Sequence, residues 1–312
     1  MKYIITGGAG FIGSNIAEEL VRQGHDVKAI DNLSAGFEEN LKGIKGVKFV
    51  KCDIRDLAVL KKEFKGYDFV LHQAALRSVP KSMDDPYSFH DVNINGHLNV
   101  LEAARVNKLK RVVFASSSSV YGDNPIMPQT ESQAPMPISP YAITKLVGER
   151  YNYMYYKIYG LETVSLRYFN VFGPRQSLES QYAVVIPKFI TDSLKGISAP
   201  IFGTGEQSRD FTYVQNIVEA NIAACNAPAE KVAGEVFNIA NGKSITVNEL
   251  YMKIQKLLGT NVKPKYMPVR AGDMLHTLSD PSKAAKLMGF RCRHDIDYGL
   301  KKTVEWFREN AD

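Results

Sequence analysis

Thr6-Gly7-Gly8-Ala9-Gly10-Phe11-Ile12-Gly13 follows a short apolar run and opens an amphipathic helical pattern. Glycines at this spacing let the backbone turn tightly and approach a pyrophosphate, while the amides at the helix start face the phosphates. A turn without a ligand is the alternative, but three glycines would then lower local stability without a structural need. The stretch therefore predicts a dinucleotide cradle formed by Gly7, Gly10, Phe11, Ile12 and Gly13.

Outward from this stretch, short β-rich runs alternate with helical patterns through the first half of the chain. Such alternation predicts right-handed βαβ units and a parallel sheet with helices on both faces, which is the doubly wound Rossmann class of α/β fold. We expect strands at residues 2–6, 27–31, 47–53, 69–73, 111–116 and 163–168, and helices at residues 11–23, 89–107 and 141–159.

The pattern loosens from about Phe172, where prolines punctuate shorter elements. We expect residues 1–171 to form the dinucleotide-binding Rossmann domain and residues 172–312 to form a smaller mixed α/β lobe for the substrate. Val236–Ala240 is a candidate strand that returns to the sheet, so a segment near residues 211–240 rejoins the first domain. Two interwoven lobes with a cleft between them follow.

The composition of the chain argues against several classes of protein. The 312 residues carry a net charge of +6, and the basic residues are spread along the chain, which argues against nucleic acid as a partner. No apolar run reaches the roughly 18 residues of a membrane helix, and no signal peptide is expected. Three scattered cysteines and six histidines without ligand spacing predict reduced thiols, no metal site and a cytoplasmic location.

The choice of dinucleotide depends on Asp31, which ends the second expected strand. A carboxylate there accepts hydrogen bonds from the adenosine ribose and repels a 2′-phosphate, so the sequence favours NAD over NADP. An ordinary turn at Asp31-Asn32 is the alternative. Asp53 closes the next strand, and we expect it to cap the adenine edge. Beyond the glycines, the residues expected against NAD are Asp31, Asn32, Asp53, Ile54, Gln73, Ala74, Ala75, Asn93, Tyr141 and Lys145.

Tyr141 and Lys145 stand four residues apart in a helical pattern, so they share one face of the helix. A free tyrosine titrates near pH ~10. A neighbouring ammonium and a nicotinamide ring both favour the phenolate, so we expect the pKa of Tyr141 to fall toward neutrality. The phenolate then takes a hydroxyl proton while a hydride leaves the same carbon.

Alone, this spacing is common on ordinary helices, and two companions favour the catalytic interpretation. The serines at 116–119 follow an apolar strand, and hydroxyls at the carboxyl end of a parallel strand face the ligand crevice. We expect Ser117 to act with Tyr141 and Lys145, and Asn93 to hold a water near Lys145. Together these residues predict hydride transfer between a nicotinamide and a hydroxyl-bearing carbon.

The chain thus resembles the extended short-chain dehydrogenase/reductase family, and within it the nucleotide-sugar 4-epimerases. The resemblance covers essentially the whole chain and rests on TGGAGFIG (6–13), HQAA (72–75), SSSSVYGD (116–123), SPYAITK (139–145), LRYFNVFGPRQ (166–176), SRDFTYV (208–214) and RAGD (270–273). It implies that Tyr141 takes the proton of the sugar 4-hydroxyl, with Ser117 relaying or polarising, while hydride passes to NAD. The 4-keto sugar turns about its diphosphate, and hydride returns to the opposite face.

The resemblance also implies how a UDP-sugar is held. Arg209 and Arg270 would bind the pyrophosphate through charge-assisted hydrogen bonds. If only one of these arginines were present, a surface salt bridge would explain it. Asp273 would take the uridine ribose, and Ser78 and Ser118 would face the sugar. The implied substrate-binding set is Ser78, Ser117, Ser118, Asn170, Val185, Arg209, Arg270, Asp273 and Thr277. A homodimer through the helices at 89–107 and 141–159 is implied as well.

Residues that this chain lacks argue against two other reactions of the family, dehydration and decarboxylation. The 4,6-dehydratases carry Asp-Glu where this chain has Ser118-Ser119, and the uronate decarboxylases carry a glutamate in that stretch. Among epimerases of neutral sugars, the position of Thr277 acts as a gate, where a small residue admits an N-acetyl group. We therefore expect 4-epimerisation of UDP-GlcNAc and UDP-GalNAc, and also of UDP-glucose and UDP-galactose.

Two alternatives stay open. UDP-glucuronate 4-epimerases share the serine run, but they tend to place a threonine at Asn170 and an arginine at Ser177, and a sugar carboxylate needs a cation nearby. The other alternative belongs to a different class, a non-catalytic dinucleotide-binding regulator. Such relatives usually lose the tyrosine or the lysine, and this chain keeps Tyr141 and Lys145.

Overall fold

The computed structural model of this chain describes residues 1–177, 185–269 and 275–310. At its centre lies a seven-stranded sheet in the order β11-β6-β5-β4-β1-β2-β3, in which every neighbouring pair is parallel. Its strands are β1 (Lys2–Thr6), β2 (Asp26–Asp31), β3 (Val47–Lys51), β4 (Phe69–His72), β5 (Arg111–Ser117), β6 (Glu162–Tyr168) and β11 (Glu235–Ile239). The strand order reverses between β1 and β4, where such sheets open a ligand crevice. The predicted Rossmann class is confirmed.

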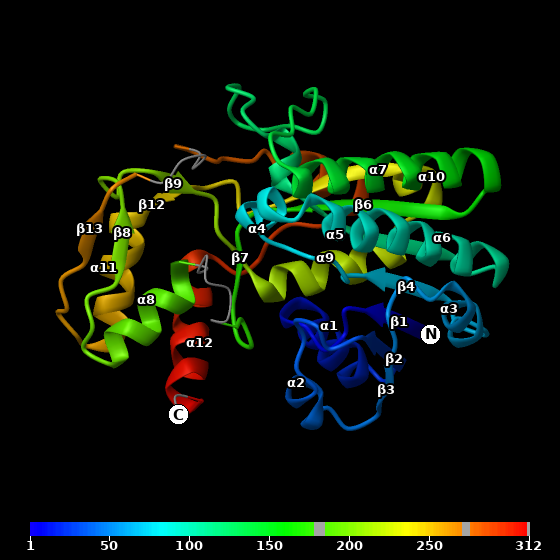
Figure 1. The fold of residues 1–312 in the computed structure, drawn as a ribbon, viewed down its shortest axis with the longest axis horizontal. Coiled ribbons are helices and arrows are strands. Elements are labelled where there is room, and N and C mark those ends of the chain that lie inside the picture. Colours follow the sequence, from blue (N-terminus) through cyan, green and yellow to red (C-terminus); the bar gives the residue numbers. More distant parts are fainter. Residues whose placement is uncertain (178–184, 270–274, 311–312) are drawn as a thin grey trace.

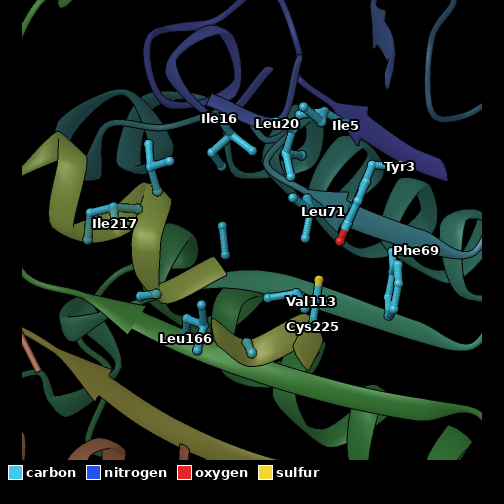
Figure 2. Packing of buried hydrophobic residues seen from close by; sticks show 14 of the residues in the cluster. Tyr3, Ile5, Ile16, Leu20, Phe69, Leu71, Val113, Leu166, Ile217 and Cys225 are labelled. Atoms are coloured by element: carbon cyan, nitrogen blue, oxygen red, sulfur yellow. The ribbon is translucent and has the colours of Figure 1, made fainter. Parts of the chain in front are cut away.

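Helices cover both faces of the sheet (Figure 1). Ile16 and Leu20 of α1 and Ile217 of α9 pack on one face, against Leu71 and Val113 (Figure 2). The opposite face is covered by α3, α6 and α7, so the strands are apolar on both sides. These helices are α1 (Phe11–Arg22), α3 (Leu57–Glu63), α6 (Gly96–Val106), α7 (Pro140–Tyr159) and α9 (Val214–Asn226).

A second lobe has its own apolar cluster, in which Phe189, Tyr251 and Leu300 are buried. It is built mainly by α8 (Val185–Leu194), α11 (Val247–Leu258) and α12 (Ile296–Glu309), with the short strands β8 (Pro200–Phe202), β9 (Ser208–Arg209), β12 (Ile245–Thr246) and β13 (Lys265–Met267). Between lobe segments the chain returns to the sheet through α9 and β11, and β11 pairs with β6. The boundary expected at residue 171 stays a prediction.

One expected element is divided. The helix predicted at residues 89–107 is a run of α5 (Pro86–His90), a π-helical turn (Asp91–Asn95) and α6. It begins earlier than predicted, because Asp85 accepts a hydrogen bond from the Ser88 amide and caps it. A π turn inserts one residue into a helix, which apolar periodicity does not reveal. Asn93 lies in the π-helical turn of this run.

The described residues also form several short elements. They are α2 (Glu39–Lys42), α4 (Val79–Asp84), α10 (Ala229–Val232), β7 (Val171–Phe172), β10 (Thr212–Tyr213), a 3-10 turn at Ser118–Tyr121 and a π turn at Ala284–Met288. Among the described residues, no helix has the length and apolar character needed to span a membrane.

Candidate active site

The glycine-rich turn joins β1 to α1 with very close backbone contacts. Gly7 has a φ of +69°, and a Cβ on it would lie 2.7 Å from the amide nitrogen of Ala74. A Cβ on Gly13 would collide with the carbonyl oxygen of Gly7. No side chain caps the start of α1, so its first amides face outward without a side-chain acceptor. Glycine is required at both positions, and the turn fits a phosphate.

A cavity of about 370 Å³ opens above this turn, at the carboxyl ends of the strands. It runs from the glycine-rich turn past the ends of β2 and β3 to the start of α7. Every residue expected against NAD lines it except Asn93. The lining residues are therefore Gly7, Gly10, Phe11, Ile12, Gly13, Asp31, Asn32, Asp53, Ile54, Gln73, Ala74, Ala75, Tyr141 and Lys145, joined by others described below.

Asp31 lies at the adenosine end of the cavity that the sequence predicts. One carboxylate oxygen accepts a hydrogen bond from the Ala9 amide at 3.1 Å, and the other accepts one from the Leu33 amide at 2.8 Å. Burial raises the pKa of Asp31, and these backbone hydrogen bonds oppose that rise. Each oxygen retains capacity for a further donor, which is what a ribose hydroxyl needs.

Asp53 is held differently from the sequence expectation. Its carboxylate accepts hydrogen bonds from the Arg55 backbone and guanidinium and from the side-chain amide of Asn32. Hydrogen bonding to Arg55 holds the pKa of Asp53 well below its usual range. Arg55 also pairs with Asp91 at 2.8 Å and lines the cavity itself. The carboxylate oxygens of Asp53 thus already accept hydrogen bonds from the protein, and the proposed contact with the adenine edge has to use the same oxygens.

Tyr141 and Lys145 lie on the face of α7 that borders the cavity. The helix begins at Pro140, and Ser139 caps it by accepting a hydrogen bond from the Ala142 amide at 3.2 Å. The Nζ of Lys145 donates to the carbonyl oxygen of Ala115 at 2.8 Å and lies 5.8 Å from the centroid of the Tyr141 ring. The pair is therefore positioned by the end of β5 as well as by its own helix.

The protonation of the pair differs from the expectation. Burial raises the pKa of Tyr141, and hydrogen bonding to Ser117 and the charge of Arg77 oppose that rise. Burial also lowers the pKa of Lys145 to about 7, so its ammonium is only partly populated at neutral pH. For the protein alone, the expected fall of the Tyr141 pKa is thus not seen, because desolvation outweighs the nearby cations. The expectation also counted a nicotinamide ring.

A buried ion pair supports this corner of the site. Glu149, two turns beyond Tyr141 on α7, accepts two hydrogen bonds at 2.8 Å from the guanidinium of Arg167 on β6. The hydroxyl of Ser116 donates to the same carboxylate at 2.6 Å. Ser116 lines the cavity and follows Ala115, the residue that accepts from Lys145. The pair thus ties α7 to the ends of two central strands.

Asn93 does not reach the cavity. Its side-chain carbonyl accepts from the Leu76 amide at 2.8 Å, and its amino group donates to the Leu76 carbonyl at 2.9 Å and to the Thr144 hydroxyl at 3.1 Å. Both amide hydrogens are therefore used, and Asn93 joins the loop after β4 to α7. Asn93 was expected to hold a water near Lys145, but its side chain has no free amide hydrogen to donate to one.

The expected substrate residues lie outside this cavity, and the described ones fall in three places. Ser78, Ser117 and Ser118 stand near the start of α4 and at the end of β5. Asn170, Arg209 and Thr277 gather beside β7 and β9, and Val185 begins α8. Arg270 and Asp273 lie outside the described residues. Ser78 and Asn170 have φ angles of +108° and +36°, and such strain in residues other than glycine concentrates at functional sites.

Thr277 is buried, and its hydroxyl accepts hydrogen bonds from the Asp210 amide and the Asn170 side chain, both at 3.3 Å. Asp210 is fully buried, and its carboxylate accepts from the amides of Asn241, Gly242 and Ser279. Burial raises the pKa of Asp210 to about 7. The expected gate is thus one member of a polar network centred on Asp210.

Arg209 is half-buried beside this network. Its Nη1 donates to the carbonyl oxygens of Ser208 at 2.9 Å and Leu275 at 3.2 Å. These bonds fix the guanidinium at the junction of β9 and the segment that leads to Thr277.

Sequence reasoning missed several lining residues, including Tyr168 and Arg77. The Tyr168 hydroxyl donates to Gln73 at 3.2 Å and accepts from Asn221 at 2.8 Å, which orients the Gln73 amide at the cavity. Its place at the carboxyl end of β6 was a usable signal. Arg77 belongs to a loop with no periodic pattern. Among the described residues, no group of three or more His, Cys, Asp or Glu is placed to hold a metal ion.

Comparison with known proteins identifies the family. A family model described as the NAD dependent epimerase/dehydratase family matches residues 3–240. The chain belongs to this family. The match confirms the predicted resemblance and the predicted cofactor, and the residues present fit that cofactor, because the turn needs glycine at the phosphate and Asp31 keeps free acceptor capacity at the ribose.

The individual relatives named here cover almost the whole chain. A solved structure of UDP-N-acetylglucosamine 4-epimerase from Methanobrevibacter ruminantium M1, in complex with UDP-N-acetylmuramic acid, is 43% identical with a TM-score of 0.94, covering 99% of this chain and 98% of that one. A putative UDP-glucose 4-epimerase of Methanocaldococcus jannaschii is 39% identical over 98% of each chain. A UDP-glucuronate 4-epimerase of Thermodesulfobacterium geofontis is 34% identical, covering 99% of this chain and 97% of that protein.

Proposed function

We propose that this chain is an NAD-dependent 4-epimerase of UDP-sugars. The observation that carries the proposal is the convergence of the glycine-rich turn, Tyr141 and Lys145 on one cavity at the carboxyl edge of the sheet. When bound there, NAD supplies a hydride acceptor and donor. Gly7, Gly13 and Asp31 are the residues proposed to hold its phosphates and ribose.

The protein's own groups move the proton. Tyr141 acts as the base that takes the proton of the sugar 4-hydroxyl, and it returns that proton after the sugar has turned. Ser117, hydrogen-bonded to Tyr141, polarises the same hydroxyl. Lys145 holds its position through the Ala115 carbonyl and adds positive charge when protonated. Arg209 and Arg270 are the proposed partners of the UDP diphosphate, and Asp273 is the proposed partner of its ribose.

We propose UDP-GlcNAc and UDP-GalNAc as the preferred pair, with UDP-glucose and UDP-galactose also accepted. The small side chain of Thr277 and the relative named as a UDP-N-acetylglucosamine 4-epimerase support this choice. UDP-glucuronate is the second candidate. It is favoured by a named relative and by Arg77, a cation at the cavity that the sequence argument did not count.

The proposal is tested by proton NMR of the purified protein mixed separately with UDP-GlcNAc, UDP-glucose and UDP-glucuronate, without added NAD. A new anomeric signal of the galacto epimer of UDP-GlcNAc is expected. Conversion of UDP-glucuronate alone would replace the preferred substrate by the second candidate. No conversion in any tube, also after NAD is supplied, would favour another nucleotide sugar as the substrate or the non-catalytic regulator.

We further propose a homodimer through α6 and α7. Tyr153 and Tyr159 are about half exposed on α7, whereas Tyr155 is buried in the core and is not available for a partner. Light scattering of the purified protein measures the mass that decides this point. A cytoplasmic location is part of the same proposal, in keeping with the reduced thiols expected from the sequence.

A further inference from the structure

Lys145 lies between two residues of α7 that its side chain can reach. Tyr141 is four residues before it and Glu149 four residues after it, so all three share one face of the helix. Lys145 and Glu149 are both buried. In such surroundings opposite charges attract strongly, so a carboxylate is a better partner for an ammonium than a neutral phenol is. Helical spacing alone would therefore predict an ion pair between Lys145 and Glu149.

The structure directs the Lys145 side chain the other way. Its Nζ donates to the carbonyl oxygen of Ala115 at 2.8 Å and lies 5.8 Å from the centroid of the Tyr141 ring. Lys145 and Tyr141 also line the same cavity. The ammonium therefore lies at the end of β5 beside the proposed base, although a carboxylate stands one helical turn further along.

The carboxylate of Glu149 is already occupied by groups from the sheet. Arg167 of β6 donates from Nε and Nη2 to its two oxygens, each at 2.8 Å, and the Ser116 hydroxyl of β5 donates to it at 2.6 Å. Ser116 and Arg167 are register partners on neighbouring strands, so the two donors approach from the same place on the sheet. Glu149 is thus neutralised by a cation from another element, and Lys145 is left to Ala115 and the cavity.

Arg167 is itself held in place. Its side chain and that of Glu149 are each 4% exposed, so water does not compete for the pair. The guanidinium carbon lies 4.7 Å from the centroid of the Tyr121 ring, and the Tyr121 hydroxyl donates to Asn238 of β11 at 2.7 Å. A planar guanidinium suits both a carboxylate and an aromatic face, which an ammonium does not. Arg167 therefore stays on Glu149 without help from a ligand.

We propose that Arg167 is a positioning residue, which keeps the ammonium of Lys145 beside Tyr141 by occupying Glu149. Arg167 does not line the cavity, so it acts through these two residues of α7. The effect on the reaction rate rests on the proposed epimerase function, whereas the place of Lys145 can be observed without any substrate. The buried ion pair then has a role in the reaction beyond joining α7 to the strands.

The test compares the two halves of the ion pair. Arg167→Met leaves a buried carboxylate one turn from Lys145, so the ammonium should move to Glu149 and away from Tyr141. We then expect kcat to fall about tenfold or more, with a smaller change in KM, since a nearby opposite charge alters the ionisation of its neighbour by at least about that factor. Glu149→Gln breaks the same pair without leaving a carboxylate, so kcat should stay close to that of the wild type. The double variant should match Glu149→Gln.

Crystal structures of NAD-loaded Arg167→Met and Glu149→Gln locate Lys145 directly. In Arg167→Met, its Nζ should lie within about 4 Å of a Glu149 oxygen, the distance of an ion pair. In Glu149→Gln, it should remain on the Ala115 carbonyl. An Nζ still on Ala115 in Arg167→Met would overturn the proposal and mean that Glu149 takes up a proton instead. Equal losses of kcat in the two single variants would also overturn it and leave the pair a structural role only.

Breaking a buried pair destabilises a fold, so melting curves set the temperature at which all variants are compared. If Arg167→Met fails to fold, Arg167→Gln takes its place, because it removes the charge and keeps a donor. The crystal structures need no substrate. They decide the place of Lys145 even if the wild-type protein epimerises no UDP-sugar, a result that would contradict the proposed function alone.

Discussion

We expect single substitutions of Tyr141 and Gly13 to have the strongest effects on the proposed reaction. In the proposed mechanism, Tyr141 carries the proton, and Gly13 sets the distance between the backbone and the phosphate of NAD. Both were predictable, because their functions depend on spacing within one short segment that also has a clear strand or helix beside it. The place of Arg77 at the cavity was not predictable, because the neighbouring Leu76 is held by a hydrogen bond to Asn93, 17 residues further along the chain.

Tyr141→Phe removes the phenolic oxygen and leaves the ring, so it should retain NAD and lose at least about a thousandfold of turnover, within the range of general acid–base effects. NMR of epimerisation and ultraviolet absorbance of bound NAD measure the two properties. Turnover close to that of the wild type would remove Tyr141 from the mechanism. The edge contact of Phe89 with the ring is unaffected by this change.

Gly13→Ala places a methyl group against the Gly7 carbonyl, so we expect a loss of NAD and a lower melting temperature. Gly43→Ala is the matched control, because Gly43 has a φ of −83° and a Cβ added to it would meet no atom within 4 Å. The NAD content after gel filtration and the melting curve measure both variants. Full NAD content in Gly13→Ala would contradict the cradle.

At the scale of elements, α7 does more than present two side chains. Tyr141, Lys145 and Glu149 follow one another at four-residue intervals, so one helix face carries the proposed base, the lysine beside it and the carboxylate that joins α7 to the strands. Ser139 caps the start of the helix with its side chain, and Gly160 ends the helix with a left-handed backbone conformation. Such end signals are local, which is why its limits were predictable to within one residue.

Glu149→Ala leaves the Arg167 guanidinium buried without its carboxylate, and breaking a buried pair costs about 3–5 kcal/mol. We expect a loss of that size in the free energy of unfolding, measured by urea titration of NAD-loaded protein. Glu19→Ala is the control, because its partner Arg22 is exposed at the surface, where such pairs contribute about 0–1 kcal/mol. Equal losses in the two variants would show that burial is not the cause.

The divided helix marks the limit of element prediction. Apolar periodicity found the helical run at residues 89–107, but the π turn Asp91–Asn95 shifts the register by one residue. The Asn93 side chain bonds Leu76 and Thr144 and does not line the cavity, although its position in the helical pattern had led us to expect it beside NAD and Lys145. A side chain on a helix can be assigned a direction from sequence only when the helix is regular.

On the scale of the whole molecule, Asp210 connects segments far apart in the chain. Its backbone contacts Asn170 and Thr277, and its carboxylate accepts from Asn241, Gly242 and Ser279. The sequence indicated Asn170, Arg209 and Thr277 as substrate residues, but it did not indicate the hydrogen bonds that join Asn170 and Thr277 to Asp210. Long-range polar contacts of that kind depend on how the lobes fold together, which no local pattern encodes.

Asp210 predicts a pH dependence of stability. Burial raises its folded-state pKa from 3.8 to about 7, so between these values the folded protein holds a proton that the unfolded chain has released. The contribution of Asp210 to stability is therefore complete below about pH 4 and is lost as pH rises toward 7 and beyond. The slope is at most about 1.4 kcal/mol per pH unit.

Asp210→Asn cannot titrate, so its free energy of unfolding should approach or overtake that of the wild type as pH rises from 5 to 8. Urea titrations at each pH measure the difference between the two proteins, in which the groups common to both cancel. A difference that stays constant across this range would mean that Asp210 is ionised throughout.

The path of the backbone through β6, the second lobe, α9 and β11 has a consequence for anyone who recombines such proteins. The half proposed to bind the sugar nucleotide cannot be exchanged as one continuous segment, because its sequence contains β11, an edge strand of the central sheet. A chimera joined once near residue 171 would import a foreign β11 against the native β6. New specificities in this architecture are therefore more accessible through substitutions within one continuous chain than through swapping of modules.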